Sequence, residues 1–226
     1  MRDPYILCIE TAIGTCSVAI GKGDQPIALV TEPERNKASE RLHTMIEEVC
    51  EVARIPLKSI SAVAVSGGPG SYTGLRIGSA AAKGICYGLS IPLIHIDTLK
   101  AMQAAAKASV DREYLYYIPM IDARRMDAFI CVLNQSGEYI VPPHPATLTT
   151  TTFRTWEESN DSLFFGDALG KYKIMFSDYS SDCLENFTLS ADSMVSLAFK
   201  AFINNEIEDV AYYEPKYYKE FHSSRK

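Results

Sequence analysis

The hydrophobic pattern of the first hundred residues predicts strands and helices that alternate along the chain. Apolar residues recur at three- and four-residue spacing over residues 38–53, which is typical of a helix with one buried face. A second helix is expected from Tyr72 to about Leu89, because Ser71 can cap it after a glycine-rich loop. A third helix is expected over residues 98–109. Short apolar runs predict five strands, over residues 5–9, 16–20, 26–31, 62–66 and 92–96.

Three of these strands precede the first helix, and two strand–helix units follow it. This order predicts an α/β fold built on a mixed sheet. The second half of the chain is less regular, and we expect two lobes, residues 1–109 and 110–226, with the final helix able to pack back on the first lobe. For the second lobe the pattern predicts strands at residues 114–121, 127–133 and 162–165, a surface crossing at residues 142–145 and 149–152, a helix at residues 192–204 and a partly ordered end from residue 211.

The composition is that of an ordinary globular protein. Of 226 residues, 47% are hydrophobic and 22% are charged, which excludes the disordered and fibrous classes. The net charge of -6 gives no overall attraction to nucleic acid or to an anionic membrane. Six cysteines without a C-x-x-C pair predict reduced core thiols and no zinc site. With no signal-like start and no run of about 18 apolar residues, we expect a soluble, cytoplasmic protein.

The loop of residues 66–76, SGGPGSYTGLR, is the most specific feature of the sequence. Its glycines allow close backbone approach, and the N–H groups at the start of the following helix attract anions. The loop matches neither the Walker A motif, which needs a Gly-Lys pair, nor the dinucleotide fingerprint, whose glycine spacing is one residue shorter. Two interpretations stay open: a ligand-binding loop and a tight strand-to-helix turn.

The helix after this loop carries more small residues than helix propensity favours. Such a face allows close approach, either by another helix of the same chain or by a second subunit. The sequence does not choose between these two. The small residues are Gly74, Gly78, Ser79, Ala80, Ala81, Ala82, Gly84 and Gly88.

Polar side chains at two strand ends are candidates for chemistry. Glu10 could orient a metal-bound water near a nucleotide phosphate, or it could cap the turn that follows it. Asp122 and Arg124 form a second polar cluster, for which a structural ion pair is the commoner role. No histidines are spaced as in zinc hydrolases, and Ser66 and Ser71 lack the G-x-S-x-G context of a nucleophile. These patterns indicate no catalytic centre.

Four segments carry a family resemblance: ILCIETAIGTCSVAI, SERLHTMI, AVAVSGGPGSYTGLRIGSAAAKGICYGLSIPLIHIDTL and MIDARRMDAF. Together they resemble the TsaB (YeaZ) family of bacterial tRNA-modification proteins, densely over residues 5–99, thinly at residues 121–124 and faintly at residues 215–219. The resemblance implies a two-lobed actin/Hsp70/sugar-kinase-like (ASKHA) fold with a mixed β-sheet in each lobe.

The resemblance also implies a function. A TsaB-like protein is a non-catalytic scaffold or activator subunit that binds TsaD, which with TsaE and the TsaC product forms threonylcarbamoyladenosine next to the anticodon of tRNAs that read ANN codons. It implies TsaD and TsaE as partners, a homodimer in isolation, contact with tRNA through the complex, and no membrane.

Site residues are implied in the same way. A metal-binding H-x-x-x-H of TsaD matches Thr98 and Met102 here, which implies no catalytic residue and no metal site. No cofactor is expected to bind this subunit strongly by itself, and ATP or ADP is expected only at the interface of the complex. The implied nucleotide contacts are Glu10, Thr11, Gly68, Gly70 and Ser71, and the implied partner interface is Leu42, Met45, Val49, Gly74, Gly78, Ala81, Ala82 and Ile85.

Two alternatives stay open: a metal-dependent (glyco)peptidase of the M22 type and a sugar-kinase-like phosphotransferase. Thr98 and Met102 argue against the first, and the second needs an acidic base, for which Asp122 is the candidate. If the scaffold hypothesis holds, we expect Gly78→Leu or Ala82→Glu to block association while the fold stays largely intact.

Overall fold

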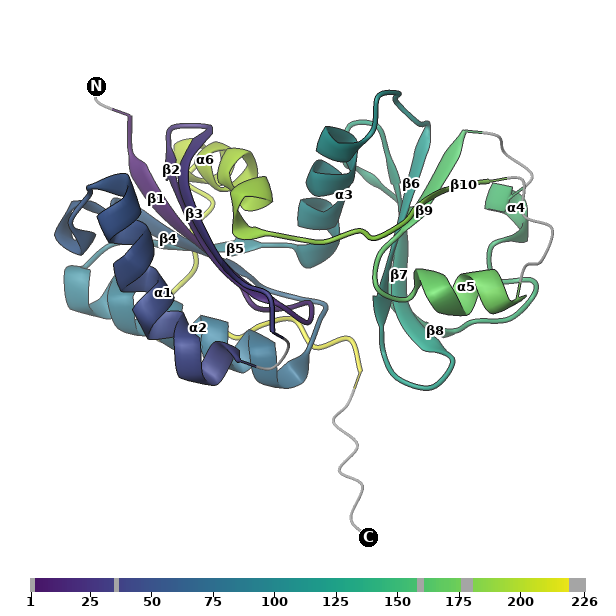
Figure 1. The fold of residues 1–226 in the computed structure, drawn as a ribbon, viewed down its shortest axis with the longest axis horizontal. Helices are drawn as coiled ribbons and strands as arrows, with labels where there is room; N and C mark the ends of the chain where they lie inside the picture. Colours follow the sequence, from purple (N-terminus) through teal and green to yellow (C-terminus); the bar gives the residue numbers. More distant parts are fainter. Residues whose placement is uncertain (1–2, 35–36, 158–160, 176–180, 220–226) are drawn as a thin grey trace, which may run out of the picture. The chain divides into compact units, whose positions relative to one another are not determined.

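The computed structural model describes residues 3–34, 37–157, 161–175 and 181–219, which form two compact units (Figure 1). Described residues up to 101 and from 189 to 216 belong to the first unit, and the others to the second. The final helix belongs to the first unit, so this unit consists of two separate stretches of the chain. Within the described ranges, no helix is both long and apolar enough to cross a membrane.

The first unit is built on a five-stranded mixed sheet in the order β3-β2-β1-β4-β5. β1 pairs antiparallel with β2 and parallel with β4, and β4 pairs parallel with β5. The central strands read as continuous apolar runs because both faces of the sheet are covered. The predicted mixed sheet is therefore confirmed. The strands are β1 Tyr5–Glu10, β2 Cys16–Lys22, β3 Gln25–Glu32, β4 Ala62–Ser66 and β5 Leu93–Ile96.

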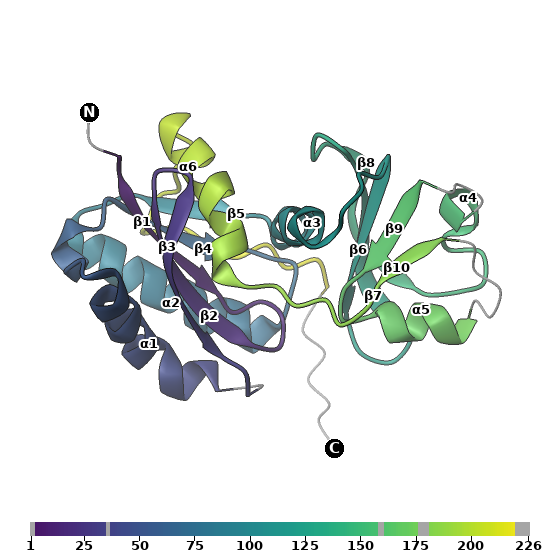
Figure 2. The ribbon, with the colours of Figure 1, turned by 45° about the horizontal axis from the view of Figure 1, so that its top comes forward.

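Helices cover both faces of this first sheet (Figures 1 and 2). α1 (Ala38–Ala53) and α2 (Tyr72–Leu89) lie side by side on one face, with the short η1 turn (Leu57–Ser59) after α1. The η2 turn (Ala191–Met194) and α6 (Val195–Ile203) lie on the other face. The predicted limits of α1 and α2 are confirmed, because their apolar periodicity and caps are encoded locally.

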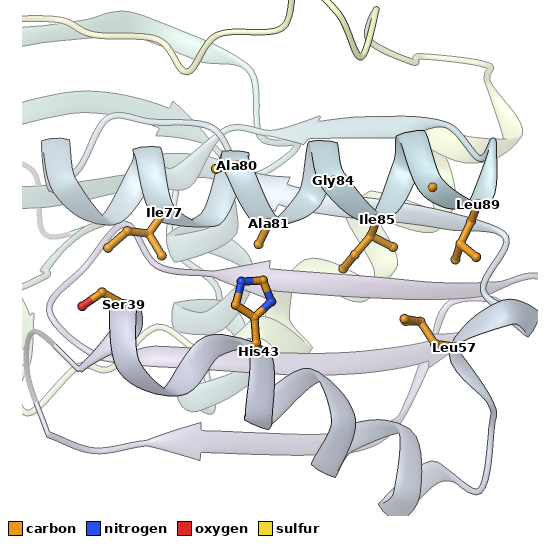
Figure 3. Close-up of a pocket in the computed structure, with 10 residues that line it drawn as sticks. Ser39, His43, Leu57, Ile77, Ala80, Ala81, Gly84, Ile85 and Leu89 are labelled. Carbon is orange, nitrogen blue, oxygen red and sulfur yellow. The ribbon is translucent and has the colours of Figure 1, made fainter.

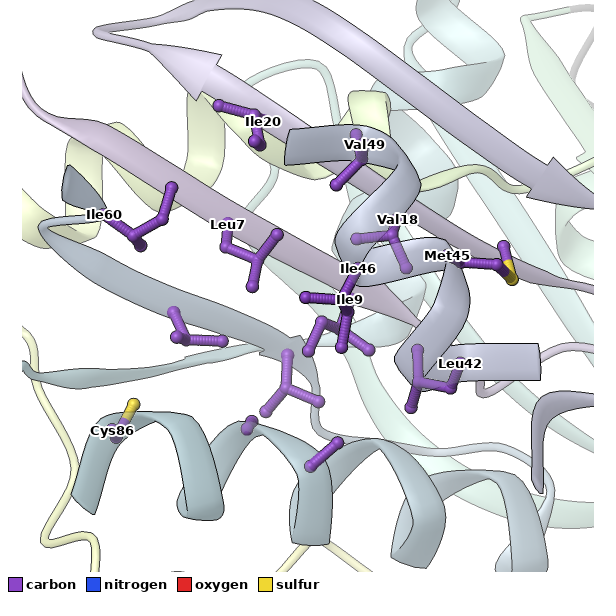
Figure 4. Packing of buried hydrophobic residues seen from close by; sticks show 14 of the residues in the cluster. Leu7, Ile9, Val18, Ile20, Leu42, Met45, Ile46, Val49, Ile60 and Cys86 are labelled. Carbon is purple, nitrogen blue, oxygen red and sulfur yellow. The ribbon is translucent and has the colours of Figure 1, made fainter. Parts of the chain in front are cut away.

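The core of the first unit lies between the sheet and the α1–α2 layer (Figure 4). Leu7 and Ile9 of β1 and Met45 and Val49 of α1 have exposed fractions of 0%. Burial of each such side chain contributes about 1.5–3 kcal/mol relative to leaving it in water. The helical stripe that the sequence predicts on α1 therefore faces the sheet of its own chain.

The second unit is built on another five-stranded mixed sheet, in the order β10-β9-β6-β7-β8. β6 pairs antiparallel with β7 and parallel with β9. Its core is aromatic: Phe164 stacks on Tyr172 with ring centroids 4.5 Å apart, and Phe153 packs edge-on against both rings. The elements are β6 Tyr116–Asp122, β7 Asp127–Asn134, β8 Tyr139–Thr147, α4 Arg154–Glu157, β9 Ser162–Phe165, α5 Leu169–Met175 and β10 Asp182–Leu184, and α3 (Thr98–Ser109) enters this unit at Met102.

Four elements of the second unit differ from the sequence-based expectation: β8, α4, α5 and β10. Residues 142–145, expected in a surface crossing, lie inside strand β8. β8 is an edge strand of its sheet, where a proline without an N–H group can be accommodated. α4, α5 and β10 were not expected, because four, seven and three residues are too few to produce a clear hydrophobic period.

The C-terminal segment is tied to the first unit by backbone contacts. The N–H of Glu208 donates to the carbonyl oxygen of Leu93 at 2.8 Å, at the edge of β5. Nζ of Lys83 on α2 donates to the carbonyl oxygen of Tyr213 at 3.1 Å, and the buried Tyr213 ring belongs to the core. The sequence predicts a partly ordered end from residue 211. Residues 211–219 follow a path with defined contacts, and residues 220–226 lie outside the described residues.

Candidate functional site

The glycine loop between β4 and α2 is held by the chain's own groups. The N–H of Gly67 donates to the last residue of β5 at 2.8 Å, and the N–H of Gly68 donates to Oγ1 of Thr98 at 3.1 Å. The N–H of Ser71 donates to the carbonyl oxygen of Ala12 at 2.7 Å. These three N–H groups are engaged within the fold, as the tight-turn interpretation requires.

Close packing explains why this loop needs glycine. A Cβ atom at Gly70 would lie 2.6 Å from the carbonyl oxygen of Ala12, and one at Gly68 would overlap the carbonyl oxygen of Lys216. Gly68 also has a φ of +106°, a conformation that residues with a side chain rarely adopt. The loop is thus clamped between the turn after β1 and the C-terminal segment.

Glu10, at the end of β1, has an exposed fraction of 0%. Its Oε1 accepts hydrogen bonds from the N–H groups of Ala12, at 2.6 Å, and Ile13, at 3.2 Å. Its Oε2 is buried and has no hydrogen-bond partner among the described residues. Burial raises the pKa of Glu10 to about 7, although the nearby Ser66 hydroxyl and the two N–H groups act to lower it. The observed contacts are those of a carboxylate that caps the turn.

The first turns of α2 pack against Thr11, the residue that follows β1. Oγ1 of Thr11 donates to the carbonyl oxygen of Gly74 at 2.8 Å, and Oγ of Ser71 caps the helix by accepting the Gly74 N–H at 3.2 Å. A Cβ atom at Gly74 would overlap the Thr11 carbonyl oxygen, and one at Gly78 would overlap Oγ1 of Thr11. These two small residues serve packing inside the chain.

The predicted nucleotide contacts therefore gather where β1 and β4 end. Apart from Oε2 of Glu10, the polar groups described above bind groups of the same chain, and nucleotide contact at these positions stays a prediction. The residues concerned are Glu10, Thr11, Gly68, Gly70 and Ser71.

The polar cluster around Asp122 is an ion-pair network within the second unit. Oδ1 of Asp122 accepts from Nζ of Lys171 at 2.8 Å and from the N–H of Arg124 at 2.6 Å. Asp127 pairs with Lys219 at 2.6 Å, and that hydrogen bond lowers the pKa of Asp127. Asp122 thus forms a structural ion pair, but its cation is Lys171, whereas the predicted partner Arg124 contributes its backbone N–H.

The two positions that the resemblance implies in place of the TsaD histidines are buried. Thr98 and Met102 both have exposed fractions of 0%, and Oγ1 of Thr98 accepts the Gly68 N–H. In the part of the chain that the structure describes, no three His, Cys, Asp or Glu side chains gather closely enough to hold a metal ion.

Most of the predicted interface residues lie inside the first unit. Leu42, Met45, Val49 and Ala82 have exposed fractions of 2% or less and face the core. Together with Gly74 and Gly78, they are not available to a partner, because the apolar stripe that predicted an interface is the stripe that packs on the sheet. The expectation that Gly78→Leu or Ala82→Glu spares the fold is corrected for the same reason: both positions are filled by this chain.

An apolar groove lies on the outward side of the same two helices, with a volume of about 630 Å³. Figure 3 shows side chains of α1 and α2 facing each other across it, with the His43 ring between the helices. Ala81 and Ile85, two of the predicted interface residues, contribute to its lining. The lining consists of Ser39, His43, Leu57, Ile77, Ala80, Ala81, Gly84, Ile85, Gly88 and Leu89.

Two glycines of this groove have no packing role within the chain. A Cβ atom at Gly84 or Gly88 would meet no described atom within 4 Å, in contrast to Gly74 and Gly78. A glycine inside a helix costs about 0.5–1 kcal/mol relative to alanine. Because this chain gains no contact from their small size, the helix backbone is left open at the groove. The apolar periodicity of the sequence did not predict the groove side of α2. The excess of small residues on this helix was a usable signal, because it included both Gly84 and Gly88.

Comparison with known proteins places this geometry in a family. The family model of TsaD, tRNA N6-adenosine threonylcarbamoyltransferase, matches residues 32–213 of the chain. The Haemophilus influenzae protein named tRNA threonylcarbamoyladenosine biosynthesis protein TsaB is 31% identical over 130 residues, which are 57% of this chain and 53% of that protein. The chain belongs to the TsaB (YeaZ) family. The chain spans about half the length of that relative, and the predicted resemblance is confirmed.

Solved structures confirm the fold. A Pseudomonas aeruginosa protein described as similar to peptidase YeaZ superposes with a TM-score of 0.81 and 23% identity, covering 96% of this chain and 100% of that one. Component A of (R)-2-hydroxyglutaryl-CoA dehydratase from Acidaminococcus fermentans superposes with a TM-score of 0.54 and 10% identity, covering 87% and 98%. The expected actin/Hsp70/sugar-kinase-like fold, with a mixed sheet in each lobe, is thus present.

The contrast between the two halves of α2 predicts opposite effects of alanine. Gly78→Ala should lower the free energy of unfolding by about 1–3 kcal/mol, because the new methyl group overlaps Thr11. Gly84→Ala should raise it by about 0.5–1 kcal/mol, because helix propensity improves and nothing is displaced. Urea denaturation at low protein concentration, where self-association is suppressed, measures both. If both substitutions changed the free energy of unfolding equally and in the same direction, the proposed difference between the two halves of α2 would be contradicted.

The buried Glu10 carboxyl predicts a pH-dependent stability difference. Its pKa of about 7 lies above that of an unfolded glutamate, so the folded state binds the extra proton and stability falls as pH rises from about 4.5 to 7. Relative to the wild type, Glu10→Gln should therefore gain about 1–3 kcal/mol of unfolding free energy between pH 5 and pH 8. Thermal and urea unfolding measure this change, and Glu47→Gln, at an exposed position of α1, is the control that should show none.

Proposed function

We propose that this protein is a non-catalytic scaffold subunit that binds TsaD in the machinery forming threonylcarbamoyladenosine next to the anticodon of ANN-reading tRNAs. Membership of the TsaB family and the name of the H. influenzae relative support a role in threonylcarbamoyladenosine biosynthesis. The proposal includes TsaE as a further partner and contact with tRNA through the complex. The groove between α1 and α2 supports the binding role.

The observation that carries the proposal is the open backbone of α2 at Gly84 and Gly88. The two glycines lower the stability of the helix, and no neighbouring group of this chain needs the space that they leave. A partner helix that lies in the groove can approach this backbone closely and bury the apolar side chains around it, such as Ile77 and Leu89. The buried apolar surface then offsets the loss of helix propensity.

TsaD is the proposed occupant because it is related to this chain over both groove helices. The TsaD family model matches residues 32–213, which include all of α1 and α2. A related protein presents an equivalent pair of helices, and equivalent faces can pair as identical faces do across the two-fold axis of a homodimer. The same argument supports a homodimer of this protein in isolation, which competes with TsaD for the groove.

The proposal assigns no catalytic residue to this chain. At the positions of the TsaD histidines, Thr98 holds the glycine loop and Met102 is buried. Asp122, the candidate base of the phosphotransferase alternative, is engaged by Lys171 and by the Arg124 N–H. These contacts give neither the peptidase nor the phosphotransferase alternative any support.

Complex formation with TsaD of the same organism tests the proposal. Multi-angle light scattering of the mixed, purified proteins should show a heteromer, and Gly84→Leu should weaken it at least about 30-fold, because the new side chain fills the space of the partner helix. Tyr87→Leu is the matched control, since Tyr87 is exposed on the same helix and does not line the groove. Absence of a wild-type heteromer, or full retention of it by Gly84→Leu, would refute the proposal.

Nucleotide binding gives a second test. ATP and ADP are proposed to bind only where TsaD completes the site, because the N–H groups of Gly68 and Ser71 are engaged within this chain. Calorimetry with ATP and Mg²⁺ should therefore give no saturable heat with the isolated protein and a stoichiometric signal with the complex. Stoichiometric binding to the isolated protein would contradict this part of the proposal and favour the phosphotransferase alternative.

A further inference from the structure

The groove is lined by one imidazole side chain. Of the described residues that line it, His43 alone carries such a group, and the others are apolar, glycine or serine. His43 is exposed on α1, and Figure 3 shows its ring between the helices, facing the small residues of α2 around Ala81. Among the described residues, the ring has no hydrogen-bond or ion-pair partner.

The charged groups near His43 lie at the rim of the groove. On α1, Glu40 and Glu47 are one turn away on either side, Glu40 is paired with Lys37 at 3.0 Å, and Glu47 is exposed. Cys50 lies two turns on, and burial raises the pKa of its thiol.

The other elements that line the groove contribute no charge to it. The α2 residues in its lining are all apolar or glycine, and η1 contributes Leu57, which Lys58 follows in the sequence. The α2 side of His43 is therefore apolar, and no carboxylate is among the described residues that line the groove.

Desolvation then acts differently on the two forms of the ring. Moving a neutral imidazole from water into an apolar contact costs much less than moving an imidazolium that lacks a buried counter-ion. Water can still reach His43 in the free chain, so both forms are tolerated there. A protein that binds only one protonation state well takes up or releases a proton on association, and its affinity then depends on pH.

We propose that His43 makes the association of this protein with TsaD pH-sensitive, with the neutral imidazole as the form that fits the filled groove. The inference rests on the proposed function, because it assumes that TsaD occupies the groove. The inference names His43 as a residue that sets the affinity for TsaD. It also gives the direction of the pH dependence, because acidification should release TsaD.

The dissociation constant for TsaD, measured by titration calorimetry at pH 5.5, 6.5 and 7.5 and constant ionic strength, tests the inference. The wild type should bind about tenfold more weakly at pH 5.5 than at pH 7.5, as expected for an imidazole that must lose its proton to be buried. His43→Leu should bind at pH 7.5 at least as tightly as the wild type and should lose most of this tenfold change. Thermal unfolding of each variant at each pH confirms that the protein measured is folded.

The controls separate this inference from the proposed function. Glu47→Gln should keep the pH dependence, because the exposed carboxylate is not the counter-ion of a buried imidazolium. Wild-type affinity that is constant with pH, tighter binding at pH 5.5, or an undiminished pH dependence in His43→Leu overturns the role of His43 while leaving the complex in place. Absence of a wild-type complex at every pH instead overturns the proposed function.

Discussion

The first unit depends on a contact between two backbones: the first turns of α2 lie directly on Thr11, at the end of β1. Only glycine fits at positions 74 and 78, because any side chain there would overlap Thr11. This contact fixes the start of α2 over the sheet and closes the glycine loop against the turn after β1. Since a helix is rigid along its length, the same contact also sets where its far end lies relative to α1.

The far half of α2 differs on the side that lines the groove, where the described chain leaves space beside its glycines. Gly84 and Gly88 leave the helix backbone open, and apolar side chains from both helices surround them. One helix therefore uses small residues for two purposes, internal packing near its start and an open groove toward its end. The groove is the feature of this unit that suits a macromolecular partner, and the folded core does not need it.

The polar groups at the end of β1 serve the architecture of the first unit. Glu10 caps a turn, Thr11 and Ser71 hold the start of α2, and Thr98 holds the glycine loop. Each of these side chains has a structural partner in the same chain. The architecture of this region therefore depends on packing and on hydrogen bonds within the chain, and the fold by itself does not fix a chemistry.

The hydrophobic periods and caps of the sequence were sufficient for the strands of the first sheet, for α1 and α2, and for the mixed-sheet class, because these signals are local. They could not place β8, whose prolines are accommodated only because it is an edge strand, or the short α5 and β10. A helical stripe such as Leu42, Met45 and Val49 looks the same whether it faces a sheet or a partner. Only the tertiary structure decided that it faces the sheet, and that Gly84 differs from Gly78, because those distinctions depend on which distant residues come within contact distance.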